Sequence, residues 1–93
     1  MPTVSAHPTP NPNSLKFVAD GASFLSSGLV AFGSAREAEG HPLGEPLFAL
    51  DGVINVFAVP QFVTVTKHPA ADWDFLVPGI EKLLAAYLAS PPA

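Results

Sequence analysis

The 93 residues contain four Lys and Arg against eight Asp and Glu, which gives a formal net charge of −4, and they contain no cysteine. Iron–sulfur clusters need thiolate ligands, so these residues alone cannot hold a conventional cluster, and a disulfide or CxxC redox pair is excluded as well. Nucleic acid and anionic membrane are disfavoured as partners, because their phosphates attract clustered basic residues and those of this chain are scattered.

The length predicts a single domain over residues 1–93. Charged residues make up only 13% of the chain, which predicts an unusually apolar surface. Such a surface is either a partner-binding patch or the ordinary exterior of a small, sticky domain. The N-terminus has no signal-peptide pattern and no stretch reaches 18 apolar residues, so a cytoplasmic protein is expected.

The first third of the chain predicts strands that are interrupted by proline. Val4 and Ala6 alternate with polar neighbours beside prolines, which is typical of an edge strand. Residues 8–13 predict an extended corner, since each proline biases its preceding residue away from helix. Residues 15–19 predict a second strand, with Leu15 and Phe17 facing inward and Lys16 outward.

Short and weak elements are expected in the middle of the chain. Residues 24–32 predict a loop that leads into a short strand, and residues 34–40 predict a polar loop. In residues 42–50, leucines at helical spacing predict a short helix, which Gly44 and Pro46 weaken.

Residues 53–59 and 62–67 give the clearest strand signals, because both segments are rich in β-branched side chains. Val63 and Val65 are expected on one face, and Phe62, Thr64 and Thr66 on the other. The connection over residues 59–61 is short enough for a hairpin.

Residues 72–89 predict an amphipathic helix, whose apolar stripe is Leu76, Ile80, Leu83, Leu84, Tyr87 and Leu88. Asp72 or Asp74 can cap it; Pro78 fits the first turn if Asp74 is the cap, and Pro91-Pro92 ends it. The element order predicts an α+β fold, with a small, mostly antiparallel sheet of about four to five strands. A short helix and the C-terminal helix are expected to pack on one face.

No pattern in the chain indicates an enzyme. The serines lack a GxSxG nucleophile elbow, and no glycine-rich phosphate loop is present. The paired carboxylates Glu37/Glu39 and Asp72/Asp74 are two residues apart, which on a helix points them to different sides and disfavours shared acid–base chemistry.

The candidate metal ligands are the three histidines, with Asp72 or Asp74 as a fourth ligand, and the signal is weak. His7, His41 and His68 are far apart in sequence and none has the spacing of a metal motif. His7 and His68 with Asp72 are the candidates if the fold brings them together; three ordinary surface or loop histidines are the favoured interpretation.

A cluster of polar residues is unusual enough to single out. Asn11, Asn13, Thr64, Thr66 and Lys67 lie on elements that become neighbours if the early and late strands meet. They form either a recognition patch or a self-bonded turn beside the solvent face of a strand, and the second interpretation is favoured. Trp73, at the start of the last helix, is more typical of a core anchor than of a ligand-stacking residue.

Three stretches together resemble a known family. Residues 9–17 (TPNPNSLKF) resemble the opening of the N-terminal domain of Nfu-type, NifU-related iron–sulfur scaffold proteins. Residues 47–67, which end in FVTVTK, resemble its middle, and residues 72–80 resemble the start of its last helix. The resemblance covers residues 3–88.

The resemblance implies a compact α+β domain with a role in iron–sulfur cluster assembly or delivery. In two-domain members, a following domain carries the CxxC pair that holds the cluster, and these 93 residues have no such pair. The resemblance therefore implies a stand-alone accessory role, with no cofactor bound by this chain alone. The partner would be a CxxC-containing Nfu-type domain or a recipient apo-protein. The positions that match the family's motifs are Asn11, Asn13, Lys16, Thr64, Thr66, Lys67 and Trp73.

Two other functions remain open. One is weak iron binding through histidine and carboxylate ligands, which suit Fe(II) but give poor selectivity. The other is peptide binding by strand addition at an uncovered sheet edge.

Overall fold

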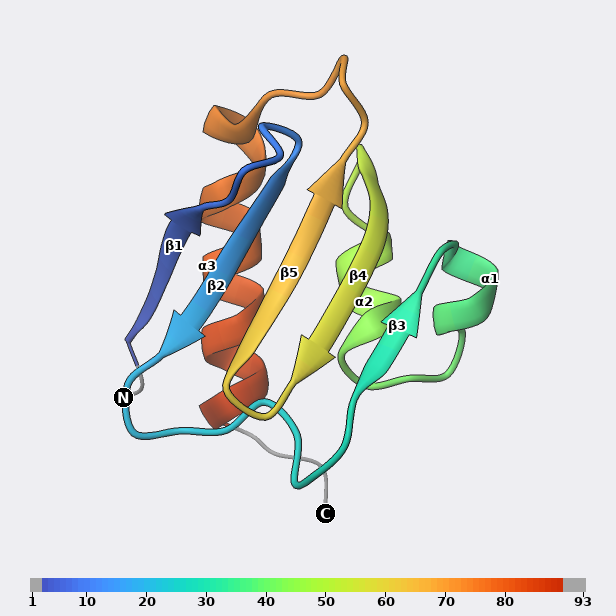
Figure 1. The fold of residues 1–93 in the computed structure, drawn as a ribbon. Helices are drawn as coiled ribbons and strands as arrows, with labels where there is room; N and C mark the ends of the chain where they lie inside the picture. Colours follow the sequence, from blue (N-terminus) through green and yellow to red (C-terminus); the bar gives the residue numbers. More distant parts are fainter. Residues whose placement is uncertain (1–2, 90–93) are drawn as a thin grey trace.

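The computed structural model describes residues 3–89, in which five strands form one sheet. Figure 1 shows the long C-terminal helix packed on one side of this sheet. All strand pairs are antiparallel, in the order β1-β2-β5-β4-β3. The predicted α+β class is therefore confirmed. In chain order, the elements are β1 (Val4–Pro8), β2 (Ser14–Ala19), β3 (Val30–Phe32), α1 (Ala35–Ala38), α2 (Gly44–Phe48), β4 (Val53–Val59), β5 (Phe62–Lys67) and α3 (Trp73–Ala89).

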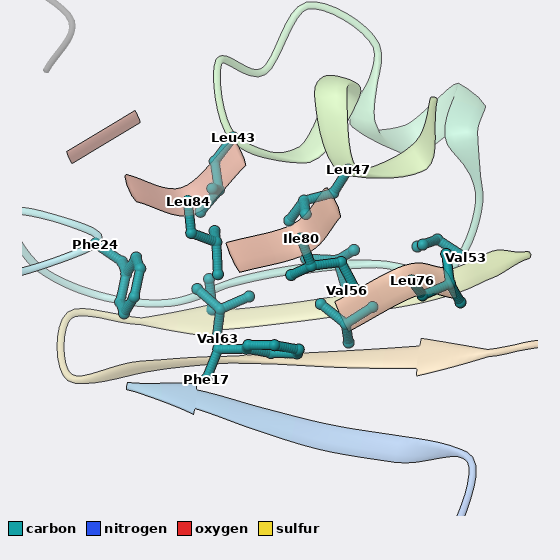
Figure 2. Packing of buried hydrophobic residues seen from close by; sticks show 12 residues of the cluster. Phe17, Phe24, Leu43, Leu47, Val53, Val56, Val63, Leu76, Ile80 and Leu84 are labelled. Carbon is teal, nitrogen blue, oxygen red and sulfur yellow. The ribbon is translucent and has the colours of Figure 1, made fainter. Parts of the chain in front are cut away.

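The strands alternate between a buried and an uncovered face, as their sequences predict. Phe17, Val63 and Ala58 lie opposite one another on β2, β5 and β4, and all three are fully buried. Figure 2 shows Phe17, Val63 and Val56 directed at side chains of the helical layer. The buried cluster is Phe17, Phe24, Leu43, Leu47, Val53, Val56, Ala58, Val63, Val65, Leu76, Ile80 and Leu84.

Helix α3 covers the sheet with one stripe, from which Leu76, Ile80 and Leu84 are buried. It begins after Asp72, whose Oδ1 accepts a 2.8 Å hydrogen bond from the Asp74 N–H. Since Asp72 caps the helix, Pro78 lies inside it and not in its first turn. The predicted stop at Pro91-Pro92 lies outside the described residues.

The prediction of a loop over residues 34–40 is wrong, because α1 forms there. The Ser34 side chain accepts from the Glu37 N–H at 3.3 Å, and Glu37 Oε1 accepts from the Gly33 N–H at 2.7 Å. These two bonds cap one short turn, and Ala38 packs at 0% exposure beneath it. The signal was present as a serine three residues before a glutamate.

The weak helix predicted for residues 42–50 is confirmed as α2, and Gly44 has a packing role at its start. A Cβ at this position would lie 2.6 Å from Cε2 of Phe32 on β3, far inside van der Waals contact. Glycine therefore allows α2 to approach β3 closely. The histidine before the helix also contributes, since His41 Nδ1 accepts from the N–H groups of Leu43 and Gly44, at 3.1 Å each.

Candidate functional site

The Asn-Pro corner between β1 and β2 is held by its own polar groups. Asn11 Oδ1 accepts from the Asn13 N–H at 2.9 Å, and the Asn11 carbonyl accepts from the Ser14 N–H at 3.0 Å. The Thr9 hydroxyl lies 2.9 Å from two backbone carbonyl oxygens, those of Asn11 and Ser14. The Asn11 side chain therefore stabilises the turn, as the favoured interpretation of the sequence predicts.

Lys67 joins this corner to the start of α3. Its side chain is only 7% exposed, and Nζ donates to Asn13 Oδ1 at 3.1 Å and to the His68 carbonyl at 3.4 Å. Nζ also lies 5.8 Å from the centroid of the Trp73 ring, whose Nε1 donates to the Pro12 carbonyl at 3.0 Å. We call Asn13, Lys67 and Trp73 the corner network. A buried cation is costly unless it is paired, and these contacts supply its partners.

The other three motif positions lie elsewhere, on the face of the sheet that the helices leave uncovered. Figure 1 views the sheet from this side, with α3 and α2 behind it. Lys16 is paired with Thr64, and Thr66 with Ser14, so their side chains share that face. We call it the open face; strand pairing gives its members as Ser5, His7, Ser14, Lys16, Val18, Ala31, Asn55, Phe57, Val59, Phe62, Thr64 and Thr66.

The structure therefore divides the seven predicted motif positions into two groups. Asn11 and the corner network use their side chains to connect the β1–β2 corner, β5 and α3. Lys16, Thr64 and Thr66 belong to the open face, where the Thr66 hydroxyl lies 2.7 Å from the Ser14 hydroxyl.

Two aromatic side chains that sequence reasoning did not select as site residues lie on the open face, on the neighbouring strands β4 and β5. The Phe57 and Phe62 rings are 6.2 Å apart, and Lys16 Nζ lies 4.7 Å from the Phe62 ring centroid. The alternation of β4 and β5 was the signal that could have identified them, since it turns both rings away from the core. The face thus combines apolar surface with one positioned cation.

The candidate metal ligands make other contacts. His68 Nδ1 accepts from the Ala70 N–H at 3.0 Å, Asp72 caps α3, and the exposed His7 ring lies 3.4 Å from the Ser5 hydroxyl. Within residues 3–89, no group of three or more His, Cys, Asp or Glu is arranged to hold a metal ion. His7, His68 and Asp72 are therefore not brought together as a site.

One hollow lies beside the helical layer and not on the open face. It has a volume of about 570 Å³ and is lined by residues 22–26, His41, Pro42, Tyr87 and Leu88. The Tyr87 hydroxyl donates to the Phe24 carbonyl at 2.8 Å, and burial raises the pKa of Tyr87 above its ordinary value. Tyr87 is therefore already engaged in holding the loop to α3.

Across the described part of the chain, no helix is long and apolar enough to cross a bilayer.

The known proteins that this chain resembles in sequence include NifU-like and NFU1 proteins. The chain is 38% identical over 87 residues to NifU-like protein 5, mitochondrial, of Arabidopsis thaliana, which covers 94% of this chain and 31% of that protein. It is 39% identical over 88 residues to the NFU1 iron-sulfur cluster scaffold homolog, mitochondrial, of Homo sapiens, and this match covers 94% of this chain and 34% of that protein. The chain thus spans about a third of the length of these curated relatives. Both names place the relatives in mitochondria, so a cytoplasmic location stays a prediction.

Solved structures agree with these sequence relatives. The solution structure of a NifU-like protein from Saccharomyces cerevisiae has a TM-score of 0.82 at 26% identity, and the match covers 95% of this chain and 79% of that one. Protein SAV1430 from Staphylococcus aureus shares the fold, with a TM-score of 0.70 at 22% identity over 87% of this chain and 96% of that one. The family model described as "Scaffold protein Nfu/NifU N terminal" matches residues 4–91. The chain therefore belongs to this family of Nfu/NifU N-terminal domains.

Proposed function

We propose that this chain is a non-enzymatic protein-interaction domain that serves iron–sulfur cluster assembly or delivery. The observation that carries the proposal is the family match over residues 4–91, whose description is that of a scaffold protein. The name of the human relative, an iron-sulfur cluster scaffold homolog, points the same way.

The chemistry of cluster ligands indicates what this domain can contribute. A cluster needs thiolates, and the 93 residues contain none, so the cluster ligands come from outside these residues. The contribution of this domain is then contact: it binds a CxxC-containing Nfu-type domain that carries the cluster, or an apo-protein that receives it.

An NMR titration tests the proposal. The labelled protein is titrated with a cluster-loaded CxxC domain from the same organism, with the cluster-free form and a Cys→Ser variant of that domain as controls. Saturable amide shifts with the cluster-loaded domain are the expected result. If neither the cluster-loaded CxxC domain nor any recipient apo-protein causes amide shifts at high excess, the proposed function is wrong, although the fold and the family remain.

A further inference from the structure

We propose that the open face is the docking surface of this domain, and that it takes a partner protein surface on which apolar side chains surround a carboxylate. This inference rests on the proposed function and specifies where the partner binds and what chemistry it presents. Three properties of the open face support it. No helix covers the face, the face carries large apolar side chains, and its strand-paired positions include a lysine but no carboxylate.

The two faces of the sheet differ in cover although both carry large apolar side chains. On the helical side, Val63 and Val65 are fully buried in the core cluster. On the open face, Val18, Phe57 and Phe62 are only partly buried, with no helix over them (Figure 1). Covering these side chains would remove apolar area from water, which is the main favourable term in protein association.

The strand-paired positions of the open face carry a cation and no carboxylate, although the chain as a whole is acidic; Asp20, whose N–H donates to the Thr3 carbonyl, lies just beyond the end of β2. The chain has eight Asp and Glu and a net charge of −4, yet strand pairing places no Asp or Glu among the open-face positions. Those positions carry Lys16 and, on the edge strand, His7. Lys16 is exposed and stands against the Phe62 ring, so a cation projects from an apolar surface without a carboxylate among its strand neighbours.

This arrangement of charged and apolar side chains indicates which kind of partner surface the open face binds. A carboxylate on the partner would pair with Lys16, while apolar groups around it would cover Phe57 and Phe62. A second copy of this chain fits poorly, because it would bring a lysine and again no open-face carboxylate. Thr64 lies between Lys16 and Phe57 in the strand pairing and supplies a hydroxyl at the centre of the contact.

Charge variants test the inference, with affinity for the cluster-loaded CxxC domain measured by titration calorimetry. Lys16→Glu should weaken binding by about tenfold or more, because it opposes the partner's carboxylate, and Lys16→Arg should keep the affinity within about threefold. Lys82→Glu is the matched control: Lys82 is an exposed lysine of α3, its replacement alters the net charge equally, and affinity should stay unchanged. Raising the salt concentration should weaken the wild type more than Lys16→Met.

Aromatic variants provide a second readout that does not depend on charge. Phe57→Ala should weaken binding, whereas Phe75→Ala should not, although the Phe75 side chain on α3 is 84% exposed. Circular dichroism and thermal unfolding confirm that each variant is folded before its affinity is compared.

The outcomes separate the inference from the proposed function. If the wild type binds and Lys16→Glu and Phe57→Ala bind equally well, the docking surface lies elsewhere and only the inference is overturned. Equal losses in Lys16→Glu and Lys82→Glu would also overturn it, since they would indicate attraction without a defined site. Self-association of the wild type that Lys16→Glu abolishes would make a second copy the occupant. If the wild type binds neither the CxxC domain nor an apo-protein, the proposed function fails first and the inference fails with it.

Discussion

Replacing Asn13 by alanine removes the side-chain oxygen that accepts from the ammonium group of Lys67, a residue that is only 7% exposed. A hydrogen bond to a charged group contributes about 1.5–3 kcal/mol. The His68 carbonyl and the Trp73 ring stay near Nζ, so we expect a loss of about 1.5–2 kcal/mol, at the lower end of that range. In a domain of this size, this loss lowers Tm by about 6–16 °C.

Lys67→Met is the informative counterpart, because it keeps most of the side-chain volume and removes the charge that needs a partner. It should cost less than about 1 kcal/mol, because no charge is left without a partner and the half-buried Asn13 side chain can accept from water instead. The backbone bond from the Lys67 N–H to the Asn13 carbonyl, at 2.8 Å, is available in both variants. In the Lys67→Met background, Asn13→Ala should cost only about 0.5 kcal/mol, a coupling of about 1 kcal/mol or more.

Urea unfolding measures all four proteins of this cycle. Far-UV circular dichroism follows the whole fold, and the fluorescence of Trp73, the single tryptophan, follows the network itself. An equal cost of Asn13→Ala in both backgrounds would refute the reasoning, because it would mean that Asn13 does not stabilise the charge. A large loss of partner affinity in a folded Asn13→Ala variant would likewise contradict the structural role of the corner network.

Three further predictions concern the helical layer. Leu84→Ala, at a fully buried position, should lower the free energy of unfolding by about 2–5 kcal/mol in urea titrations; a cost below about 1 kcal/mol would contradict the described core. Gly44→Ala should destabilise by about 1–3 kcal/mol despite the better helix propensity of alanine, because its Cβ meets the Phe32 ring; unchanged or increased Tm would contradict this packing. Burial raises the pKa of Tyr87 above its ordinary value of 10.0, so protonated Tyr87 favours the folded state and that stability is lost as the pH rises beyond 10. Tyrosinate absorbance follows the ionisation of this single tyrosine directly. The free energy of unfolding of the wild type should fall with rising alkaline pH more steeply than that of Tyr87→Phe. Equal slopes would show that the environment of Tyr87 does not desolvate its hydroxyl.

The sequence predicted the sheet better than the helical layer. β4 and β5 were predicted with their correct bounds, because β-branched alternation is a strong local signal. The inward side of β2 was also predicted correctly, through Leu15 and Phe17. Short α1 was missed, since its formation depends on a reciprocal cap and on the packing of Ala38, neither of which has a hydrophobic period.

The candidate site was predicted only in part, for a physical reason. Motif matching selects positions without knowing their side of the sheet, so Lys16 and Lys67 were grouped although one is exposed on the open face and the other is buried in the corner network. Strand pairing separates them, and pairing over a distance of about fifty residues is not visible in a local pattern. Alternation in the sequence placed Phe62 on the face opposite Val63 and Val65, but neither Phe62 nor Phe57 was selected as a site residue, because phenylalanine is typical of a core.

The measurement that tests the central claim most directly is NMR cross-saturation from the cluster-loaded CxxC domain to the methyl groups of this protein. It reports direct proximity, whereas amide shifts also report indirect changes. The account predicts strong saturation transfer to the methyl groups of Val18, Val59 and Thr64 on the open face, and little to those of Leu83 on α3. Strong transfer to the α3 methyl groups with none to the open face would contradict it.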